Sequence, residues 1–201
     1  MVLREMGDFE GACTHLEQAA AIMRTLEEPR WVKFPLLVLA SLSIRLGHIE
    51  QAATYYEEGL RLNRELGDTE GTANAMYGMG SVLLARGEYG KARRWCEEGL
   101  SLYRTLNHQF GMAWCHSVLG DIEAAIGNLS TALAYYRQTL AVWLQRGDEV
   151  NSARTLAAIA AVLQQQGASQ HATQLMGTVE AVYARAHVQL PPHETTLHHA
   201  L

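Results

Sequence analysis

Five glycines stand at intervals of 40 residues along this chain, and each is followed five positions later by an alanine. The glycines are Gly7, Gly47, Gly87, Gly127 and Gly167, and the alanines are Ala12, Ala52, Ala92, Ala132 and Ala172. Two unbroken columns in register indicate an internal repeat. A fixed period of this length indicates a chain that folds by stacking one small structural unit on the next.

Apolar residues between the glycines recur at three- and four-residue steps, which is the period of an α-helix. The pattern predicts two helices in each unit, a first helix (A) and a second helix (B). The A helices are expected over 31–46, 70–86, 110–126 and 150–166, and the B helices over 8–26, 48–66, 88–106, 128–146 and 168–186. The chain contains only 4 prolines, which leaves long stretches free to be helical. We therefore predict an all-α fold.

The glycine column suits the left-handed residue that ends an A helix. The residue after it, which is Asp8, Glu88 or Asn128 in three of the units, is expected to cap the start of helix B or to place a favourable charge there. Because the link is so short, helices A and B should pack as antiparallel neighbours. The column alanines would then let helix B approach helix A closely, with Gly80 and Gly120 as the facing notch.

The repeat divides the chain into units of constant length. We expect a half repeat over 1–27, repeats over 28–67, 68–107, 108–147 and 148–186, and a C-terminal tail over 187–201 that starts a further element. Residues 1–6 can supply only the last turn of an A helix. The chain is therefore expected to be a fragment, or a shortened reading frame, of a longer protein.

Two motifs relate the chain to a known family. Met79-Gly80 and Leu119-Gly120 resemble the Leu-Gly pair in the first helix of the tetratricopeptide repeat (TPR), and the column alanines resemble the Ala of its second helix. The resemblance covers about residues 1–186. It implies an α-α superhelix, a TPR-like solenoid of antiparallel helical hairpins. The period of 40 adds about six residues to the usual repeat.

Repeats of this length resemble a particular group of TPR proteins. The turn LGDTEGTA at 66–73 and the tail segment LPPHE at 190–194 are similar to those of large bacterial signal-transduction regulators of the LuxR and AfsR types. Such regulators carry an NTPase domain and usually a helix-turn-helix domain. This chain contains no G-x-x-x-x-G-K-[ST] loop and no basic recognition helix.

Charge and composition argue against several classes of function. The net charge is -5 and no run of Lys and Arg forms a basic stripe, so direct nucleic-acid binding is not expected. No apolar run approaches the roughly 20 residues that span a bilayer, so we expect no membrane partner. The 3 cysteines are an odd number without paired spacing, which argues against a disulfide framework. We expect a cytoplasmic protein in a reducing environment.

Candidate catalytic and metal-binding residues have simpler explanations. Cys115 and His116 are adjacent, and adjacent helical side chains diverge by about 100°. Cys96 replaces the Tyr of neighbouring units and should be a small core residue. The glutamate pairs at 57–58 and 97–98 recur in the repeat, which indicates a solvated outer face.

The tail is rich in histidine but lacks the acidic or thiol ligands of a closed metal site. Its histidines are His187, His193, His198 and His199, with Glu194 as their only acidic neighbour. We predict no catalytic residue, no metal site and no cofactor.

The concave face of such a solenoid, lined by A helices, is its usual binding surface. The inward register predicts partner-binding residues at Phe34, Arg45, Asn74, Tyr77, Ser81, Trp114, Ser117, Asp121 and Arg154. TPR domains that bind chaperones grip a C-terminal carboxylate with Lys and Asn at these positions. This chain has Ser81 and Asp121 there instead, so we do not expect a carboxylate clamp.

Three functions remain open. The first is a non-catalytic module that binds a protein or peptide, or another domain of its parent regulator. The second is a sensor of a small inducer, with a pocket around Tyr77 and Trp114. The third is self-association. Because the first unit is incomplete, the helix at 8–26 would expose Phe9, Leu16 and Ile22 and form a homodimer.

Overall fold

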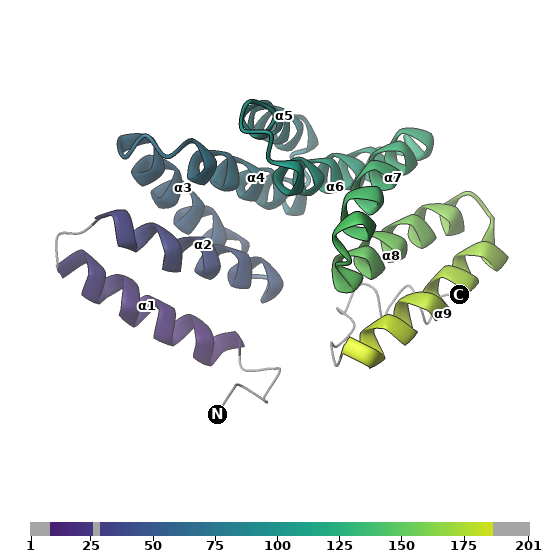
Figure 1. Cartoon of the computed structure of the whole chain (residues 1–201), viewed down its shortest axis with the longest axis horizontal. Helices are drawn as coiled ribbons and strands as arrows, with labels where there is room; N and C mark the ends of the chain where they lie inside the picture. The colour runs from purple at the N-terminus through teal and green to yellow at the C-terminus, as the bar shows by residue number, and fades with distance from the viewer. Residues whose placement is uncertain (1–8, 26–28, 187–201) are drawn as a thin grey trace. The chain divides into compact units, whose positions relative to one another are not determined.

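The structure is a computed structural model, and it describes residues 9–25 and 29–186. These residues form nine helices and no strand (Figure 1). The helices are α1 (Phe9–Thr25), α2 (Pro29–Arg45), α3 (Ile49–Glu65), α4 (Thr69–Ala85), α5 (Tyr89–Thr105), α6 (Gln109–Ala125), α7 (Leu129–Arg146), α8 (Glu149–Gln165) and α9 (Ser169–Ala186). Every expected A and B helix is present, and its ends lie within two residues of the expected ones. The all-α fold is confirmed.

The chain divides into two compact units. The first runs to Gly111 and holds α1 to α5 with the start of α6, and the second begins at Met112. Within the first unit each helix packs beside the next one in sequence (Figure 1). In the second unit α7 packs on α8 and α8 on α9. There α6 contacts α7, since Thr139 Oγ1 donates a hydrogen bond to the Ala113 carbonyl over 3.3 Å.

The glycine column ends the A helices as expected. Gly47, Gly87, Gly127 and Gly167 all have positive φ, between 73° at Gly87 and 85° at Gly127, and this left-handed conformation closes the helix and turns the chain into the next one. Gly7 and Asp8 lie outside the described residues.

The expected capping hydrogen bond is missing at Glu88 and Asn128, whereas the alternative, a favourable charge at the helix start, is present at Glu88. Both residues occupy the N-cap position, but neither side chain accepts a hydrogen bond from the helix. Their ψ angles are 57° and 60°, well short of the 93° at Asp68, whose Oδ1 accepts a hydrogen bond from Gly71 N. Asp148 caps α8 in the same way through Asn151 N. The capping side chains therefore start A helices instead.

The small-residue columns lie where the helices touch. The alanines at 52, 92, 132 and 172 are completely buried. The notch glycines face helix B as expected, and a Cβ added at Gly80 would lie 3.4 Å from the Ala92 carbonyl oxygen, but the nearest side chain is not that of the alanine. A Cβ added at Gly80 would lie 2.3 Å from Cys96 Sγ, and one added at Gly120 would lie 2.6 Å from Tyr136 Cε1. Each glycine therefore makes room for the side chain four positions after the alanine. Cys96 is fully buried, which confirms its core role.

Candidate functional site

The predicted binding residues of the first unit lie on α2 and α4. Phe34 is 56% exposed. Arg45, at the end of α2, places its guanidinium carbon 4.4 Å from the centre of the Phe9 ring. On α4, Asn74 Oδ1 accepts a hydrogen bond from the Tyr103 hydroxyl over 2.5 Å. Ser81 and Tyr77 are half-buried, and Ser81 Oγ donates to the Tyr77 carbonyl over 3.3 Å.

The predicted residues of the second unit lie on α6 and α8. Trp114 is half-buried, with its ring centre 6.4 Å from that of Trp143. Ser117 and Asp121 follow on α6, each half-buried. Arg154 on α8 is exposed, and its Nη1 donates to Asn151 Oδ1 over 3.4 Å. The nine predicted residues thus fall into two groups, one in each unit.

Asp121 is the one carboxylic acid among the nine predicted residues, and its pKa is shifted. Burial raises the pKa of its carboxyl to about 6, although a hydrogen bond from the Tyr136 hydroxyl to Oδ1, 2.7 Å long, acts in the opposite direction. The same burial, together with the carboxylate, raises the pKa of the Tyr136 hydroxyl. Asp121 is therefore committed to an internal partner, and its charge is expensive to maintain at neutral pH.

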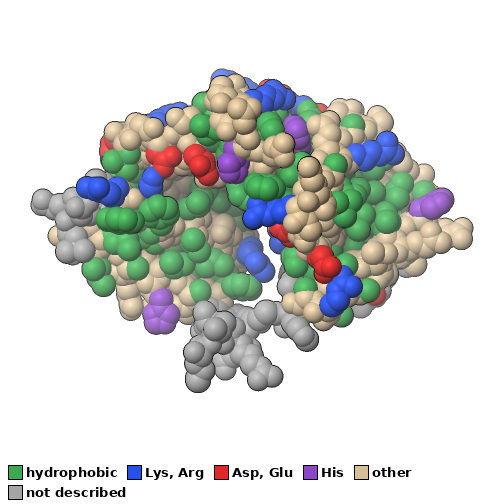
Figure 2. Space-filling model, viewed as in Figure 1, with side chains coloured by type: hydrophobic (Ala, Val, Ile, Leu, Met, Phe, Trp, Pro, Cys, Tyr) green, Lys and Arg blue, Asp and Glu red, His purple; other side chains and the backbone are tan. Residues whose placement is uncertain are grey.

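The most apolar exposed surface of the first unit lies on α2. Large hydrophobic side chains of this helix remain at least one-third exposed, and they are Trp31, Phe34, Leu37 and Val38. Figure 2 shows hydrophobic side chains gathered on the face of the molecule over α1 and α2, with charged side chains at the margin. Apolar groups in such a cluster are the usual mark of an interaction surface.

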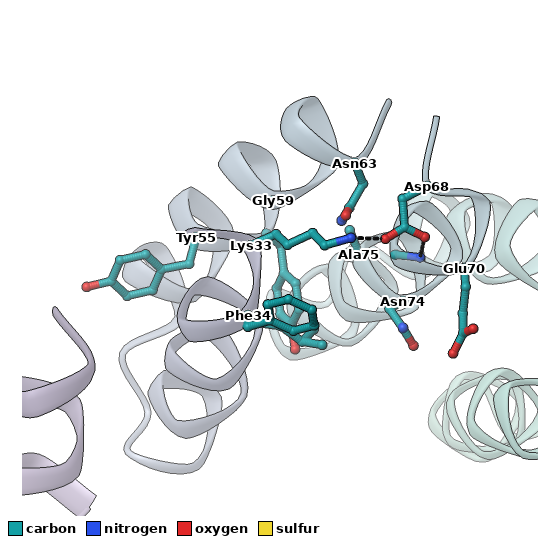
Figure 3. Close-up of a pocket in the computed structure, with 12 residues that line it drawn as sticks. Lys33, Phe34, Tyr55, Gly59, Asn63, Asp68, Glu70, Asn74 and Ala75 are labelled. Carbon is teal, nitrogen blue, oxygen red and sulfur yellow. Dashed lines mark hydrogen bonds and ion pairs between the residues drawn. The ribbon is translucent and has the colours of Figure 1, made fainter. Parts of the chain in front are cut away.

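A pocket of about 220 Å³ opens beside this apolar face, between α2, α3 and α4 (Figure 3). Its walls include Phe34 and Leu37 from α2, Tyr56 and Asn63 from α3, and Asn74 from α4. Two of the predicted binding residues, Phe34 and Asn74, therefore line one cavity. Burial raises the pKa of the Tyr56 hydroxyl further above its ordinary value.

One edge of the pocket is an ion pair that joins α2 to the start of α4. Lys33 Nζ contacts Asp68 Oδ2, and Asp68 Oδ1 accepts from Gly71 N over 2.8 Å, as Figure 3 shows. Burial raises the pKa of Asp68, but the hydrogen bonds from Lys33 and Gly71 more than offset it, and the pKa falls below its usual value. The charges at this edge are therefore paired with each other.

The sequence prediction missed Asn63, Lys33 and Asp68. One pattern in the sequence points to Asn63. Positions 23, 63, 103, 143 and 183 keep the step of the repeat and read Met, Asn, Tyr, Trp and Tyr. An amide thus stands in a column of large apolar and aromatic residues, which marks the repeat where the packing differs.

The side chains first suspected of chemistry lie in packing positions. Cys115 is fully buried, and burial raises the pKa of its thiol to about 12, so it is protonated at neutral pH. The ring centre of its neighbour His116 lies 5.7 Å from that of Tyr135. Of the glutamate pairs, Glu58 forms an ion pair with Arg24, with 2.7 Å between Oε2 and Nη2. The other three glutamates of these pairs are exposed.

Two further findings concern metals and membranes. In the described part of the chain, no three His, Cys, Asp or Glu side chains are grouped so as to bind a metal ion. The tail histidines and Glu194 lie outside the described residues. Among the helices from α1 to α9, none combines the length and the apolar character needed to cross a bilayer.

A stack of short antiparallel helix pairs with an exposed apolar face defines a helical-repeat scaffold. The sequence matches the family model of the tetratricopeptide repeat over residues 1–65, 35–105 and 71–145. The chain therefore belongs to the tetratricopeptide repeat family. This fold is generally a non-catalytic scaffold for protein interactions.

Solved structures share this fold at low sequence identity. BtubC from P. vanneervenii is 21% identical with a TM-score of 0.67, and the match covers 94% of this chain and 78% of that one. A Rap protein complexed with competence and sporulation factor is 13% identical with a TM-score of 0.80, covering 90% and 51%. The apo form of RapI is 16% identical with a TM-score of 0.68, covering 92% and 80%. No curated protein sequence matches the chain.

Proposed function

We propose that this chain binds an extended peptide, or an exposed segment of a partner protein, along the A-helix face that carries α2 and α4. The observation that carries the proposal is the apolar surface of α2, where Trp31 and Phe34 are both more than half exposed. Isolated exposed apolar residues are normal, but several on one helix face beside a pocket are typical of a recognition surface. The face also offers few charges, which suits a peptide recognised by its side chains.

The comparisons support a peptide as the partner. One of the structural neighbours is a Rap protein in complex with competence and sporulation factor. This chain spans about half of that protein. We therefore propose for this chain only a similar mode of binding. We further propose that the chain acts within a bacterial signalling regulator of the LuxR or AfsR type in the cytoplasm, where its three free thiols remain reduced.

The predicted residues of the second unit, Trp114, Ser117, Asp121 and Arg154, are proposed to contact the same partner. Asp121 already accepts a hydrogen bond from Tyr136. We therefore expect its substitution to act partly through the packing of α6 on α7, whereas Trp114 would act through contact.

Selection from a phage-displayed library of random linear 12-residue peptides tests the proposal. Synthetic copies of the enriched peptides would be titrated, by fluorescence anisotropy, against the wild-type chain and against Phe34→Ala, Tyr77→Ala and Trp114→Ala. Glu97→Ala, at an exposed position of α5, is the control. We expect each aromatic substitution to weaken binding about tenfold or more, as truncation of an aromatic anchor does. The proposal fails when no peptide is enriched, or when all the variants bind as the wild type does.

A sensor of a small inducer is the main alternative. The pocket of about 220 Å³ lies below the roughly 300–1,000 Å³ of pockets that enclose small-molecule ligands. Its size therefore favours one side chain of a peptide over a whole metabolite. A thermal-shift screen separates the two, because a ligand at 100 times its dissociation constant adds about 2.7 kcal/mol of stability.

Self-association through α1 is favoured by one observation, the 60% exposure of Ile22. Phe9 and Leu16 on the same helix are half-buried. Light scattering at tens of micromolar distinguishes a homodimer from a monomer. An Ile22→Glu variant should dissociate any dimer that forms through this helix.

A further inference from the structure

The pocket beside α2 contains a buried acceptor without a donor. Asn63 is 6% exposed, and its Oδ1 forms no hydrogen bond within the described part of the chain. Figure 3 shows the Asn63 amide directed from α3 toward the same side of the pocket as Lys33 and Asp68. Those two residues are paired with each other. A buried carbonyl oxygen that lacks a partner is costly, so its presence in a native site calls for an explanation.

The next repeat shows which kind of side chain fills the equivalent place. Tyr103, which stands 40 residues after Asn63, is completely buried. A Cβ added at Gly111 would lie 2.2 Å from the Tyr103 ring, and one added at Gly71 would lie 2.3 Å from Asn63 Oδ1. Each residue therefore packs on a glycine eight positions further along. The Tyr103 ring fills its site, and its hydroxyl donates to Asn74 Oδ1.

The shorter Asn63 side chain cannot fill the equivalent space. The pocket that lies there has an apolar side, formed by Phe34, Leu37 and Tyr56, and the orphan oxygen at its wall. Its volume of about 220 Å³ corresponds to roughly seven water molecules at about 30 Å³ each. Water against three apolar walls is poorly held, and its displacement by an apolar group favours binding.

We propose that this pocket receives a tyrosine or tryptophan side chain of the bound peptide, and that the Asn63 amide turns into the pocket so that its Oδ1 accepts a hydrogen bond from the hydroxyl or indole N–H. The inference rests on the proposed function, since it names the residue class that the peptide inserts. The aromatic ring packs against Phe34 and Leu37. Tyr and Trp combine a large apolar body with one donor that requires a partner when buried.

Other side chains fit the pocket less well. Asp and Glu bring no donor for the oxygen when ionised. Lys and Arg would place a second cation beside Lys33. Phe and Leu supply no donor, so they would leave Asn63 Oδ1 unpaired, as it is within the described residues of the free chain. The peptide residue thus takes the position that Tyr103 occupies from within the chain in the next repeat.

The library selection described above also tests this inference. Among peptides enriched on the wild-type chain, we expect one conserved Tyr or Trp. For a synthetic peptide carrying that Tyr, replacement by Phe should weaken binding about 2- to 10-fold, the usual effect of one hydrogen bond. The protein variant Asn63→Leu removes the acceptor at similar volume. It should weaken the Tyr peptide by the same factor and leave the Phe peptide unchanged.

A second variant blocks the pocket with the residue that its own repeat uses. Asn63→Tyr should retain the fold, because Tyr103 occupies the equivalent position in the next repeat. It should weaken binding of the Tyr peptide about tenfold or more. Arg64→Tyr is the matched control, because it introduces the same side chain at the adjacent, exposed position of α3. Circular dichroism of both variants checks that the helices are intact. If Asn63→Tyr does not fold, the comparison of Tyr and Phe peptides on wild type and Asn63→Leu still decides the matter.

The outcomes separate the two proposals. Enrichment of no peptide overturns the proposed function and this inference together. Enriched peptides that lack a common Tyr or Trp, or that bind Asn63→Tyr as tightly as wild type, overturn the pocket assignment alone. Equal binding of Tyr and Phe peptides to the wild-type chain removes the role of Asn63 Oδ1.

Discussion

Replacement of Gly120 by alanine tests whether α6 and α7 approach as closely as the structure indicates. A Cβ at this position would lie 2.6 Å from Tyr136 Cε1 and 2.9 Å from Cδ1, which is closer than non-bonded carbon atoms approach. The Tyr136 ring cannot swing aside, because it is 2% exposed and its hydroxyl is hydrogen-bonded to Asp121. The Gly120→Ala variant must therefore displace the ring, α7 or both.

The magnitude follows from three opposing effects. Overpacking of a close-packed core costs about 1–3 kcal/mol. Loss of the hydrogen bond from Tyr136 to Asp121 costs about 1 kcal/mol more. Alanine in a helix interior is favoured over glycine by about 1 kcal/mol. Gly120→Ala should therefore lower the free energy of unfolding by about 1–3 kcal/mol.

Gly177→Ala is the matched control for this substitution. Gly177 lies in α9 of the same unit, and a Cβ added there meets nothing within 4 Å. Only the gain in helix propensity remains, so this variant should be more stable than wild type by about 0.5–1 kcal/mol. Urea titration followed by circular dichroism compares the two variants, and hydrogen exchange of the α6 and α7 amides locates the effect. A Gly120→Ala variant that is stabilised as Gly177→Ala is would refute the close approach of Tyr136 to α6.

Three further predictions follow from the structure. Because burial raises the pKa of Asp121 to about 6, the fold should lose stability as pH rises from about 4 through 6. The free energy of unfolding of Asp121→Asn should therefore exceed that of wild type by about 1–3 kcal/mol at about pH 7.5 and equal it near pH 4. An equal difference in urea titrations at both pH values would contradict this. Half-buried Cys13 should react with iodoacetamide before buried Cys115, whose pKa is about 12, and mass spectrometry after timed quenching gives the order. Asp148→Ala removes the cap on Asn151 N and should cost about 1 kcal/mol in a urea titration, whereas an unchanged midpoint would show that the cap is dispensable.

The helices were predictable because their pattern is local. Apolar spacing and the left-handed glycines indicate where each helix begins and ends, and the observed bounds differ from the expected ones by at most two residues. The small shifts at α4 and α8 have a clear cause. Asp68 and Asp148 cap these helices and start each A helix one residue early.

The candidate site was only partly predictable, because its side chains are paired across helices. Phe34 was expected on the exposed face and is exposed. Asn74 and Asp121 were expected to be available to a partner, but Tyr103 and Tyr136 already donate hydrogen bonds to them. These tyrosines come from B helices 29 and 15 positions further along. The periodicity of apolar residues along one helix contains no information about hydrogen bonds between side chains of different helices.

Comparing equivalent positions of the repeats shows which residues depart from the pattern. It does not show how the structure changes at those residues. The equivalents of Cys96 are Leu16, Tyr56, Tyr136 and Met176, and those of Asn63 are Met23, Tyr103, Trp143 and Tyr183. Both positions therefore carry a side chain smaller than their equivalents. At Cys96 the facing backbone comes close, since a Cβ added at Gly80 would lie 2.3 Å from its Sγ, and the residue is fully buried. At Asn63 the equivalent space stays open as a pocket.

The difference between the two sites lies in the residues that surround them. A glycine faces each residue, since an added Cβ would lie 2.3 Å from Cys96 Sγ at Gly80 and 2.3 Å from Asn63 Oδ1 at Gly71. Only the Asn63 pocket has an edge where Lys33 and Asp68 connect α2 to α4. We infer that this ion pair keeps α2 and α4 far enough apart to admit an aromatic ring, which the chain itself does not supply at this position.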